Sequence, residues 1–481
     1  MPFPASYICV DPSHPRHRDT RILLVYPNCG SDARNISVHL PLSLLHAAAL
    51  LQDFSVALFD QRIDEPSRYE KLLEQQPACV GFSTMTGPQI KFALGLAEMA
   101  KAKGIPTVFG GVHPSLLPEQ TQADPRVDYV IAGEGEAAFR ELASALAAGR
   151  KPAPILRGKA VALDSLPDIN YDLVDGEQYI QSAMARGRSL PLIFSRGCPY
   201  QCTFCCNPVL SNQNWRHVGI PLLAERVHRL AERFRLEALN FFDENLFASP
   251  KTLRELVAAL GGKLRWFAQC RANSLLRFEP AFLRESGAQV LSCGLESGSP
   301  GILKAIRKEE TVEEYIAANR LLAQTDIATW YNYMMGFPGE TIEDLQATVQ
   351  LALRMLDENP HAANNPFYLL SPYPGTKIAQ EHLREAMPKN LEGWADFNRH
   401  NLAATWHPPE RMELYKRIYF SSKFVGRRIV NLFPQDQELR SVAETFTGKW
   451  RSFNFADRGE WEPLEEAGWR VLKRLFGEHA Y

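Results

Sequence analysis

The sequence lacks any apolar run of about 18 residues or more, so it predicts no membrane-spanning helix. The start, residues 1–20, also lacks the apolar core of a signal peptide. Neither sign of charge dominates: the formal net charge is −2, which argues against a basic field for nucleic acid. These absences favour a globular cytoplasmic protein without a nucleic-acid partner, and they leave peripheral membrane contact open.

Cysteine is scarce and unevenly placed. The 481 residues include nine cysteines, an odd number, and four of them fall within residues 198–206. No C-x2-C pair exists outside that segment. This distribution fits a reducing compartment and metal chemistry rather than a disulfide framework. The length suggests about three domains at roughly 150 residues each.

The cysteine-rich segment 195–206 reads Ser-Arg-Gly-Cys-Pro-Tyr-Gln-Cys-Thr-Phe-Cys-Cys, with Cys198, Cys202 and Cys205 at C-x3-C-x2-C spacing. Apolar residues 192–195 predict a short buried strand that leads into this loop. Thiolates select zinc, copper(I) or iron–sulfur clusters. Zinc would normally need a fourth ligand, whereas a 4Fe–4S cluster held by three cysteines keeps one iron open. The loop therefore predicts a metal centre that can bind a substrate or cofactor.

This spacing, with Phe204 just before the third cysteine, resembles the radical S-adenosylmethionine (SAM) superfamily. The resemblance implies that the three cysteines hold a 4Fe–4S cluster, that SAM binds the open iron, and that Phe204 lies near the adenine. It also implies a 5'-deoxyadenosyl radical, made with an electron from a low-potential donor such as flavodoxin or ferredoxin. A zinc loop, or buried structural thiols, is the alternative explanation.

Residues 191–380 repeat a strand and helix pattern of six β/α units, which predicts an open partial barrel with its chemistry at the C-terminal strand ends. A polar or Gly/Pro cluster follows each predicted strand. By the resemblance, Arg271 orients the SAM carboxylate through its forked guanidinium, and Glu296 meets the amino group or ribose. A structural salt bridge, cap or turn is the alternative for each residue. The predicted SAM contacts beside the cysteine loop are Asp243, Arg271, Glu296, Met334, Gly336 and Pro338, the last three bordering the adenine.

Residues 17–150 alternate short apolar strands with helices, which predicts a parallel sheet covered on both faces. Ligands bind such sheets beyond the carboxyl ends of the strands, and the loops there are rich in small and hydroxyl residues. These loops resemble the Rossmann-like, flavodoxin-type cobalamin-binding domain that precedes many radical SAM domains. A Rossmann-like module that binds nothing is the alternative. The predicted cobalamin contacts are Ser83, Thr84, Gly110, Gly111, His113, Gly133 and Glu134.

One motif is missing from this first domain. Cobalamin domains of the methionine synthase type carry Asp-x-His-x-x-Gly, whose histidine ligates cobalt, and the sequence has no such motif. The resemblance implies that cobalamin is held without a lower protein ligand. His113 follows a Gly-Gly turn, and a loop histidine without any contact to cobalt is its alternative interpretation.

The remaining segments carry less chemistry. Residues 1–16 are predicted as an N-terminal extension, 151–190 as an ordered linker, and 381–481 as a helical C-terminal region. The C-terminal aromatic and basic residues are typical of a core with a solvated face, although they could instead line a substrate pocket, close the barrel or touch an acidic membrane. Cys206, Cys270 and Cys293 are scattered, so buried thiols are favoured over an auxiliary cluster.

Together these patterns predict an α/β cobalamin-dependent radical SAM enzyme acting on a small molecule or peptide. Hydrogen abstraction from an unactivated carbon is expected to be followed by methyl transfer from methylcobalamin. One alternative is radical cyclisation, ring contraction or oxidation without methyl transfer. Methylthiolation of tRNA is a further alternative, although Cys9, Cys29 and Cys79 have different surroundings from the cysteines of that family. A cobalamin sensor or carrier would leave the cysteine loop unexplained.

Overall fold

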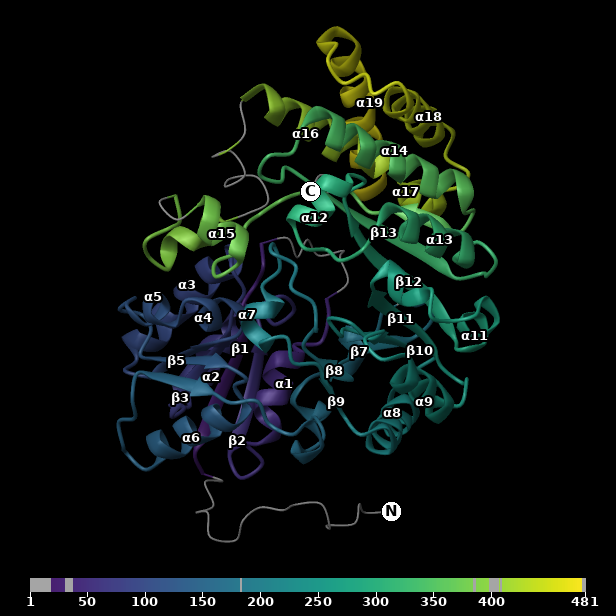
Figure 1. Ribbon diagram of the computed structural model, residues 1–481. Coiled ribbons are helices and arrows are strands. Elements are labelled where there is room, and N and C mark those ends of the chain that lie inside the picture. Colours follow the sequence, from purple (N-terminus) through teal and green to yellow (C-terminus); the bar gives the residue numbers. More distant parts are fainter. Residues whose placement is uncertain are drawn as a thin grey trace. The chain divides into compact units, whose positions relative to one another are not determined.

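The computed structural model describes residues 19–30, 38–181, 184–383, 386–397, 406 and 409–477 (Figure 1). The chain divides into two compact units. The first unit comprises residues 1–179 and 387–397, and the second comprises residues 180–386 and 398–481. The predicted extension 1–16 lies outside the described residues.

The first unit is built on a six-stranded parallel sheet with the order β2-β1-β3-β4-β5-β6. The core positions of β1 and β3 are apolar and buried, as expected for a sheet covered on both faces. All five predicted strands are present. The strands are β1 (Arg21–Tyr26), β2 (Ser55–Asp60), β3 (Cys79–Ser83), β4 (Thr107–Gly110), β5 (Tyr129–Gly133) and β6 (Ile155–Gly158).

Helices cover both faces of this sheet. On one face α1 (Leu42–Ala49) packs against α6 (Glu136–Ala147). On the other, α2 (Pro66–Glu74) meets α3 (Pro88–Ala102), where the Tyr69 hydroxyl donates to the Leu96 carbonyl over 2.8 Å. Two short helices, α4 (Val112–Leu116) and α5 (Pro118–Gln122), join β4 to β5.

Two segments join the first unit from outside the predicted 17–150 range. Strand β6 lies within the predicted linker and adds to the sheet beside β5. The linker also contains three 3-10 turns, η1 (Leu163–Ser165), η2 (Tyr171–Leu173) and η3 (Gly176–Tyr179). From far along the chain, η4 (Glu392–Asp396) packs against α3, and its Trp394 Nε1 donates to Gln120 Oε1 of α5 over 2.6 Å. The local sequence pattern could not predict that residues 387–397 join the first unit, because this depends on tertiary contacts.

The second unit contains a parallel sheet with the order β14-β13-β12-β11-β10-β7. Its strands are β7 (Ser189–Leu192), β10 (Ala238–Phe241), β11 (Arg265–Cys270), β12 (Ala288–Glu296), β13 (Ala328–Met335) and β14 (Ala362–Asn364). The short β15 (Tyr368–Leu369) pairs with β13 beyond β14.

Two strand predictions in this unit need correction. The predicted first strand, 192–195, is replaced by β7, because the N–H groups of Phe194 and Ser195 bond to Asp243 instead of a neighbouring strand. The predicted sixth strand, 367–370, is the minor β15, and the edge strand is β14. No strand was predicted at 362–364, where the Asn364 side-chain amide donates to the Ala352 carbonyl over 3.0 Å.

Helices pack on one face of this sheet and continue into the C-terminal region (Figure 1). No helix within the described ranges combines the length and apolar character needed to span a bilayer. The helices up to residue 383 are α7 (Asn207–Ser211), α8 (Ile220–Phe234), α9 (Pro250–Leu260), α10 (Ala272–Leu275), α11 (Pro280–Glu285), α12 (Pro300–Ala305), α13 (Val312–Leu322), α14 (Ile342–Glu358) and α15 (Lys377–His382).

The C-terminal helices form an aromatic core of their own. They are α16 (Pro409–Val425), α17 (Arg428–Leu432), α18 (Gln437–Arg451) and α19 (Arg458–Phe476), and α18 packs on α14. Phe446 and Trp461 are fully buried with ring centroids 5.6 Å apart, and Trp450 is buried beside them. These three aromatic side chains therefore belong to a hydrophobic core, as the sequence analysis favoured, and do not line an open surface.

Candidate functional site

The cysteine loop begins where β8 (Ser195–Arg196) pairs with β9 (Arg216–His217) in an antiparallel ribbon. Cys198, Cys202 and Cys205 lie on the loop between these strands, and all three are half-buried. Burial raises the pKa of the Cys198 and Cys202 thiols. A hydrogen bond with Cys206, followed by burial, raises the pKa of Cys205. Thiols of this kind become thiolates when a metal binds, because coordination displaces the proton.

Two acidic residues at the end of β10 hold this loop. Ser195 donates both its N–H and its hydroxyl to Asp243 Oδ1, each over 2.5 Å, and Phe194 N–H donates to Oδ2 over 3.2 Å. Glu244 Oε2 accepts from Gly197 N–H over 3.1 Å. Burial raises the pKa of Asp243 to about 7. Both oxygens of Asp243 are thus engaged by the loop backbone, and its predicted contact with SAM stays a prediction.

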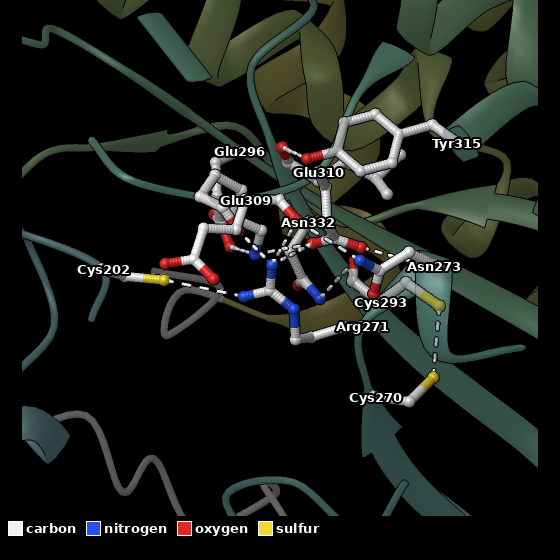
Figure 2. Close-up of polar contacts among 12 residues, drawn as sticks. Cys202, Cys270, Arg271, Asn273, Cys293, Glu296, Glu309, Glu310, Tyr315 and Asn332 are labelled. Carbon is white, nitrogen blue, oxygen red and sulfur yellow. Dashed lines mark hydrogen bonds and ion pairs between the residues drawn. The ribbon is translucent and has the colours of Figure 1, made fainter. Parts of the chain in front are cut away.

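A buried charge quartet, made of Arg271, Glu296, Lys308 and Glu310, lies beside the cysteine loop. Figure 2 shows Arg271 reaching Cys202, with its Nη1 atom 3.7 Å from the cysteine Sγ. Its guanidinium carbon also lies 3.6 Å from the centre of the Tyr200 ring. Arg271 Nη2 donates to the Lys308 carbonyl and lies 3.4 Å from Glu310 Oε2. The contact between Arg271 and Cys202 joins a predicted SAM-binding residue directly to a predicted cluster ligand.

Lys308 completes the quartet and was not predicted. Its Nζ atom lies 3.0 Å from Glu296 Oε1 and 3.5 Å from Glu310 Oε2. The side chains of Lys308 and Glu310 are 6% and 0% exposed, so two cations face two anions away from water. Glu296 also has a left-handed φ of 66°, a strained conformation that clusters at functional sites. Lys308 lies in the charged sequence Arg-Lys-Glu-Glu, residues 307–310. From the sequence alone, this stretch looks like a run of solvent-exposed charges, so the burial of Lys308 could not be predicted.

The turn predicted to border the adenine follows β13. Gly336 N–H donates to Glu340 Oε2 over 2.7 Å, and the Tyr415 hydroxyl of α16 donates to the same oxygen over 3.2 Å. Burial raises the pKa of Glu340 to about 7. Phe337 brings the turn to the cysteine loop, since its ring lies 6.2 Å from that of Phe204. Met334 and Pro338, also predicted here, are half-buried on either side of the turn.

Buried polar atoms without a hydrogen-bond partner gather at these strand ends. Such atoms are rare in native proteins and point to a missing ligand or water. Asn245, directly after the Asp243–Glu244 pair, has neither side-chain polar atom partnered although it is 1% exposed. The donor and acceptor types fit a zwitterionic, ribose-bearing ligand such as SAM. The others among the described residues at this edge are Thr203 Oγ1, Arg271 Nε, Asn273 Oδ1 and Glu340 Oε1.

Two of the remaining cysteines lie on adjacent strands of the sheet. Cys270 and Cys293 are buried register neighbours on β11 and β12, with their sulfur atoms 3.3 Å apart (Figure 2). Within the described ranges, no three His, Cys, Asp or Glu side chains converge on a single-ion site.

In the first unit, the predicted cobalamin residues lie at the carboxyl ends of the adjacent strands β3, β4 and β5. Gly111, at φ 98°, passes so close to Thr84 that a Cβ would lie 2.8 Å from the Thr84 carbonyl oxygen. The glycine is therefore required by the protein backbone itself. The rest of the edge offers half-exposed Ser83, Gly110 and Glu134 and exposed Gly133. Accessible backbone and hydroxyl groups at one sheet edge fit a large polar cofactor.

His113 differs from its neighbours because it is fully buried. Its Nδ1 lies 2.9 Å from Thr86 Oγ1, and Trp394 covers its ring at a centroid distance of 5.6 Å. Burial lowers the pKa of His113 to about 4. The Nε2 atom of His113 has no hydrogen-bond partner among the described residues, and its predicted contact with cobalamin stays a prediction.

This burial predicts a pH-dependent stability. The unfolded chain protonates His113 below about pH 6.5, whereas the folded side chain stays neutral to about pH 4. Stability is therefore lost as pH falls through this window, by about 2 kcal/mol between pH 7 and 5. In thermal melts, His113→Asn should remove that part of the pH dependence, and the same substitution at exposed His361 should keep it. Parallel pH profiles for the wild type and His113→Asn would contradict the prediction.

Two family models match separate parts of the chain. Residues 35–143 match the B12 binding domain and residues 192–352 match the radical SAM superfamily. These matches confirm the predicted order of the two domains, the α/β fold class, and the cofactor set of 4Fe–4S cluster, SAM and cobalamin.

Curated relatives and solved structures agree with these models. Bacteriochlorophyllide d C-12(1)-methyltransferase of Chlorobaculum tepidum is 28% identical over 357 residues, covering 72% of this chain and 74% of the relative. Anaerobic magnesium-protoporphyrin IX monomethyl ester cyclase of Rubrivivax gelatinosus is 26% identical over 467 residues, covering 87% and 80%. The cobalamin-dependent SAM radical enzyme OxsB, solved with aqua-cobalamin and SAM, shares the fold with a TM-score of 0.70 and 17% identity, covering 96% and 75%.

Proposed function

We propose that this chain, which belongs to the radical SAM superfamily and carries a B12-binding domain ahead of its radical SAM domain, transfers a methyl group to an unactivated carbon. The observation that carries the proposal is the 3.7 Å contact between Arg271 Nη1 and Cys202 Sγ. It places a buried, forked cation and its carboxylate partners directly beside the predicted cluster ligands. Such a site suits a ligand that brings a carboxylate and an amino group to a metal centre.

Each bound group has residues that would hold it. Cys198, Cys202 and Cys205 would hold the cluster, and Arg271 and Glu296 would take the carboxylate and amino ends of SAM. Ser83, Gly110, Gly111, Gly133 and Glu134 would line the cobalamin edge. When bound, these groups supply the electron transfer, the hydrogen-abstracting radical and the methyl group.

The protein's own contribution is placement and exclusion of water. Asp243 and Glu244 fix the loop backbone through Ser195 and Gly197. The buried charge quartet keeps Arg271 charged and oriented without water. The turn 335–340 closes the same edge, because Glu340 binds both Gly336 N–H and Tyr415 of α16.

The proposal also covers the electron donor, the cellular location and the class of substrate. The reducing electron comes from a low-potential protein donor such as flavodoxin or ferredoxin, and the enzyme works in the cytoplasm. The substrate is a small molecule or peptide rather than a nucleic acid, a view supported by the net charge of −2.

The test is anaerobic reconstitution with iron, sulfide and hydroxocobalamin, followed by incubation with a metabolite extract, a low-potential reductant and SAM labelled in its methyl group. The expected result is iron and corrinoid uptake, 5'-deoxyadenosine formation and a product that carries the label. Absence of corrinoid uptake, or of any labelled product, would contradict methyl transfer.

A second candidate is radical cyclisation without methyl transfer. The specific observation in its favour is the similarity to the Rubrivivax gelatinosus cyclase, which covers more of this chain than the methyltransferase match does. In the same incubation it would give 5'-deoxyadenosine together with a product that lacks the labelled methyl group.

A further inference from the structure

The parallel sheet of the second unit has two unlike faces. One is sealed by helices: the Tyr331 hydroxyl, for example, donates to Asn319 Oδ1 of α13 over 2.7 Å. Along β13 the residues alternate strictly, with Thr329, Tyr331 and Tyr333 buried and their neighbours half-buried. We call the other face the inner face; it carries Phe267, Gln269, Val290, Ser292, Trp330 and Asn332.

The inner face is open at its centre. Gln269 is exposed although β11 is an interior strand of the sheet. Below it lies an apolar floor where Phe267 and Val290 are buried and Trp330 packs against them. The Trp330 ring lies 5.8 Å from that of Phe267. A face with an apolar floor and accessible polar groups is typical of a small-molecule site.

A chain of amides crosses this face. Asn332 Nδ2 donates to Ser292 Oγ over 3.0 Å, and Asn365 Nδ2 donates to Asn332 Oδ1 over 2.7 Å. Asn365 Oδ1 in turn accepts a hydrogen bond from Arg428 Nη1. The network therefore runs from the middle of the sheet to a cation that the C-terminal region supplies.

Backbone geometry brings Arg428 into this place. Asn364 of the edge strand donates its N–H to the Gly426 carbonyl over 2.8 Å, and a Cβ on Gly426 would lie 2.3 Å from the Asn364 carbonyl oxygen. Only glycine allows this approach. Arg427, at φ 66°, then turns away and donates to the Leu356 carbonyl over 2.8 Å. The next residue, Arg428, is thereby directed onto the inner face.

Within the part of the chain that the structure describes, Arg428 has no anionic partner. Its guanidinium carbon lies 3.9 Å from the centre of the Trp330 ring. Among the described residues, no carboxylate pairs with it, and Asn365 is the one acceptor of its five N–H donors. Arg428 is half-buried, and this burial lowers its pKa. A half-buried guanidinium without a carboxylate is unfavourable, and a ligand anion would relieve the imbalance.

We propose that Arg428, together with Asn365 and Asn332, binds an oxyanion of the substrate, a carboxylate or a phosphate-type group, while the apolar body of the substrate lies on Trp330 and Phe267. This inference rests on the proposed function, since it places the methyl acceptor on the inner face. The forked guanidinium matches the planar geometry of such anions. The substrate class is therefore an amphipathic organic acid or phosphoester.

The test uses the full chain without SAM or reductant, titrated with 3-phenylpropionate, phenylphosphate and the neutral 3-phenylpropionamide and followed by ligand-observed NMR. The wild type should bind an anionic probe about tenfold more tightly than the amide, with dissociation constants in the millimolar range. Arg428→Met should abolish that preference, and Arg428→Lys should keep part of it. Arg440→Met, an exposed arginine on α18, is the matched control and should bind like the wild type.

The outcomes separate the alternatives. Tighter binding of phenylpropionate assigns a carboxylate, and tighter binding of phenylphosphate assigns a phosphate-type group. No charge preference in the wild type, or a preference that survives in Arg428→Met, would overturn the proposal. The melting temperature of Arg428→Met without probe should stay within about 2 °C of wild type, and a larger drop would assign a structural role. Because the titration needs no turnover, its result stands whether or not methyl transfer is found.

Discussion

Lys308→Met is expected to destabilise the second unit by about 3–5 kcal/mol, the usual cost of leaving a buried ion pair without one partner. The substitution keeps the length and apolar stem of the side chain but removes the cation between Glu296 and Glu310. Glu296 would then lose its ion-pair partner, and Glu310 would keep only Arg271. A fall in melting temperature of order 10 °C should follow, and calorimetry of the apo-protein measures it.

Two further variants make this prediction specific. Lys304→Met, an exposed lysine on the preceding helix α12, should change the melting temperature by less than about 1 °C. The double variant Lys308→Met/Glu296→Gln should recover part of the loss, because it removes one carboxylate with the cation. If Lys308→Met melts like Lys304→Met, the charge quartet does not hold this edge of the sheet together.

Cys202→Ala is expected to lower 5'-deoxyadenosine formation by more than about 10³-fold, the scale on which removal of an essential catalytic group acts. With one of three thiolates gone, the loop should also incorporate less iron and sulfide after anaerobic reconstitution. Because Arg271 Nη1 lies 3.7 Å from Cys202 Sγ, SAM binding should weaken in the same variant. Elemental analysis, visible absorbance and equilibrium dialysis with labelled SAM measure these three effects.

The neighbouring thiol provides the control for this experiment. Cys206→Ala changes the residue next to Cys205 and leaves the C-x3-C-x2-C spacing intact. It should retain iron content and most of the 5'-deoxyadenosine yield. Full iron content in Cys202→Ala, or its loss in Cys206→Ala alone, would mean that the cluster ligands are wrongly assigned.

Local sequence pattern predicted the parts of this fold that local chemistry determines. The apolar runs of β1 and β3 and the C-x3-C-x2-C spacing are short-range signals, and their expected positions agree with the structure. The structure places Arg271, which follows a predicted strand, against the cysteine loop, with Nη1 3.7 Å from Cys202 Sγ. A parallel sheet gathers its carboxyl ends at one edge whatever the sequence between them.

The missed features depend on contacts between distant segments. Lys308 lies in a charged stretch of the sequence. Its burial depends on ion pairs with Glu296, at the end of β12, and with Glu310, in the loop between α12 and α13. Strand β14 ends in Asn364, whose side-chain amide donates to the Ala352 carbonyl and whose backbone N–H donates to the Gly426 carbonyl. Arg428 was grouped with solvated basic residues, yet Gly426 directs it onto the sheet. Polarity alone does not reveal which polar groups find partners inside.

The return of residues 387–397 to the first unit has a consequence for the order in which the chain is made. The first 179 residues leave the ribosome before their last structural piece has been translated, and that piece follows about 200 residues later. At typical synthesis rates of about 5–20 residues per second, the delay is roughly 10–40 s. During that time, His113 lacks its ring contact with Trp394, and Gln120 lacks its hydrogen bond from Trp394. The nascent B12-binding domain is therefore incomplete until the radical SAM barrel behind it has emerged, so the two domains mature together.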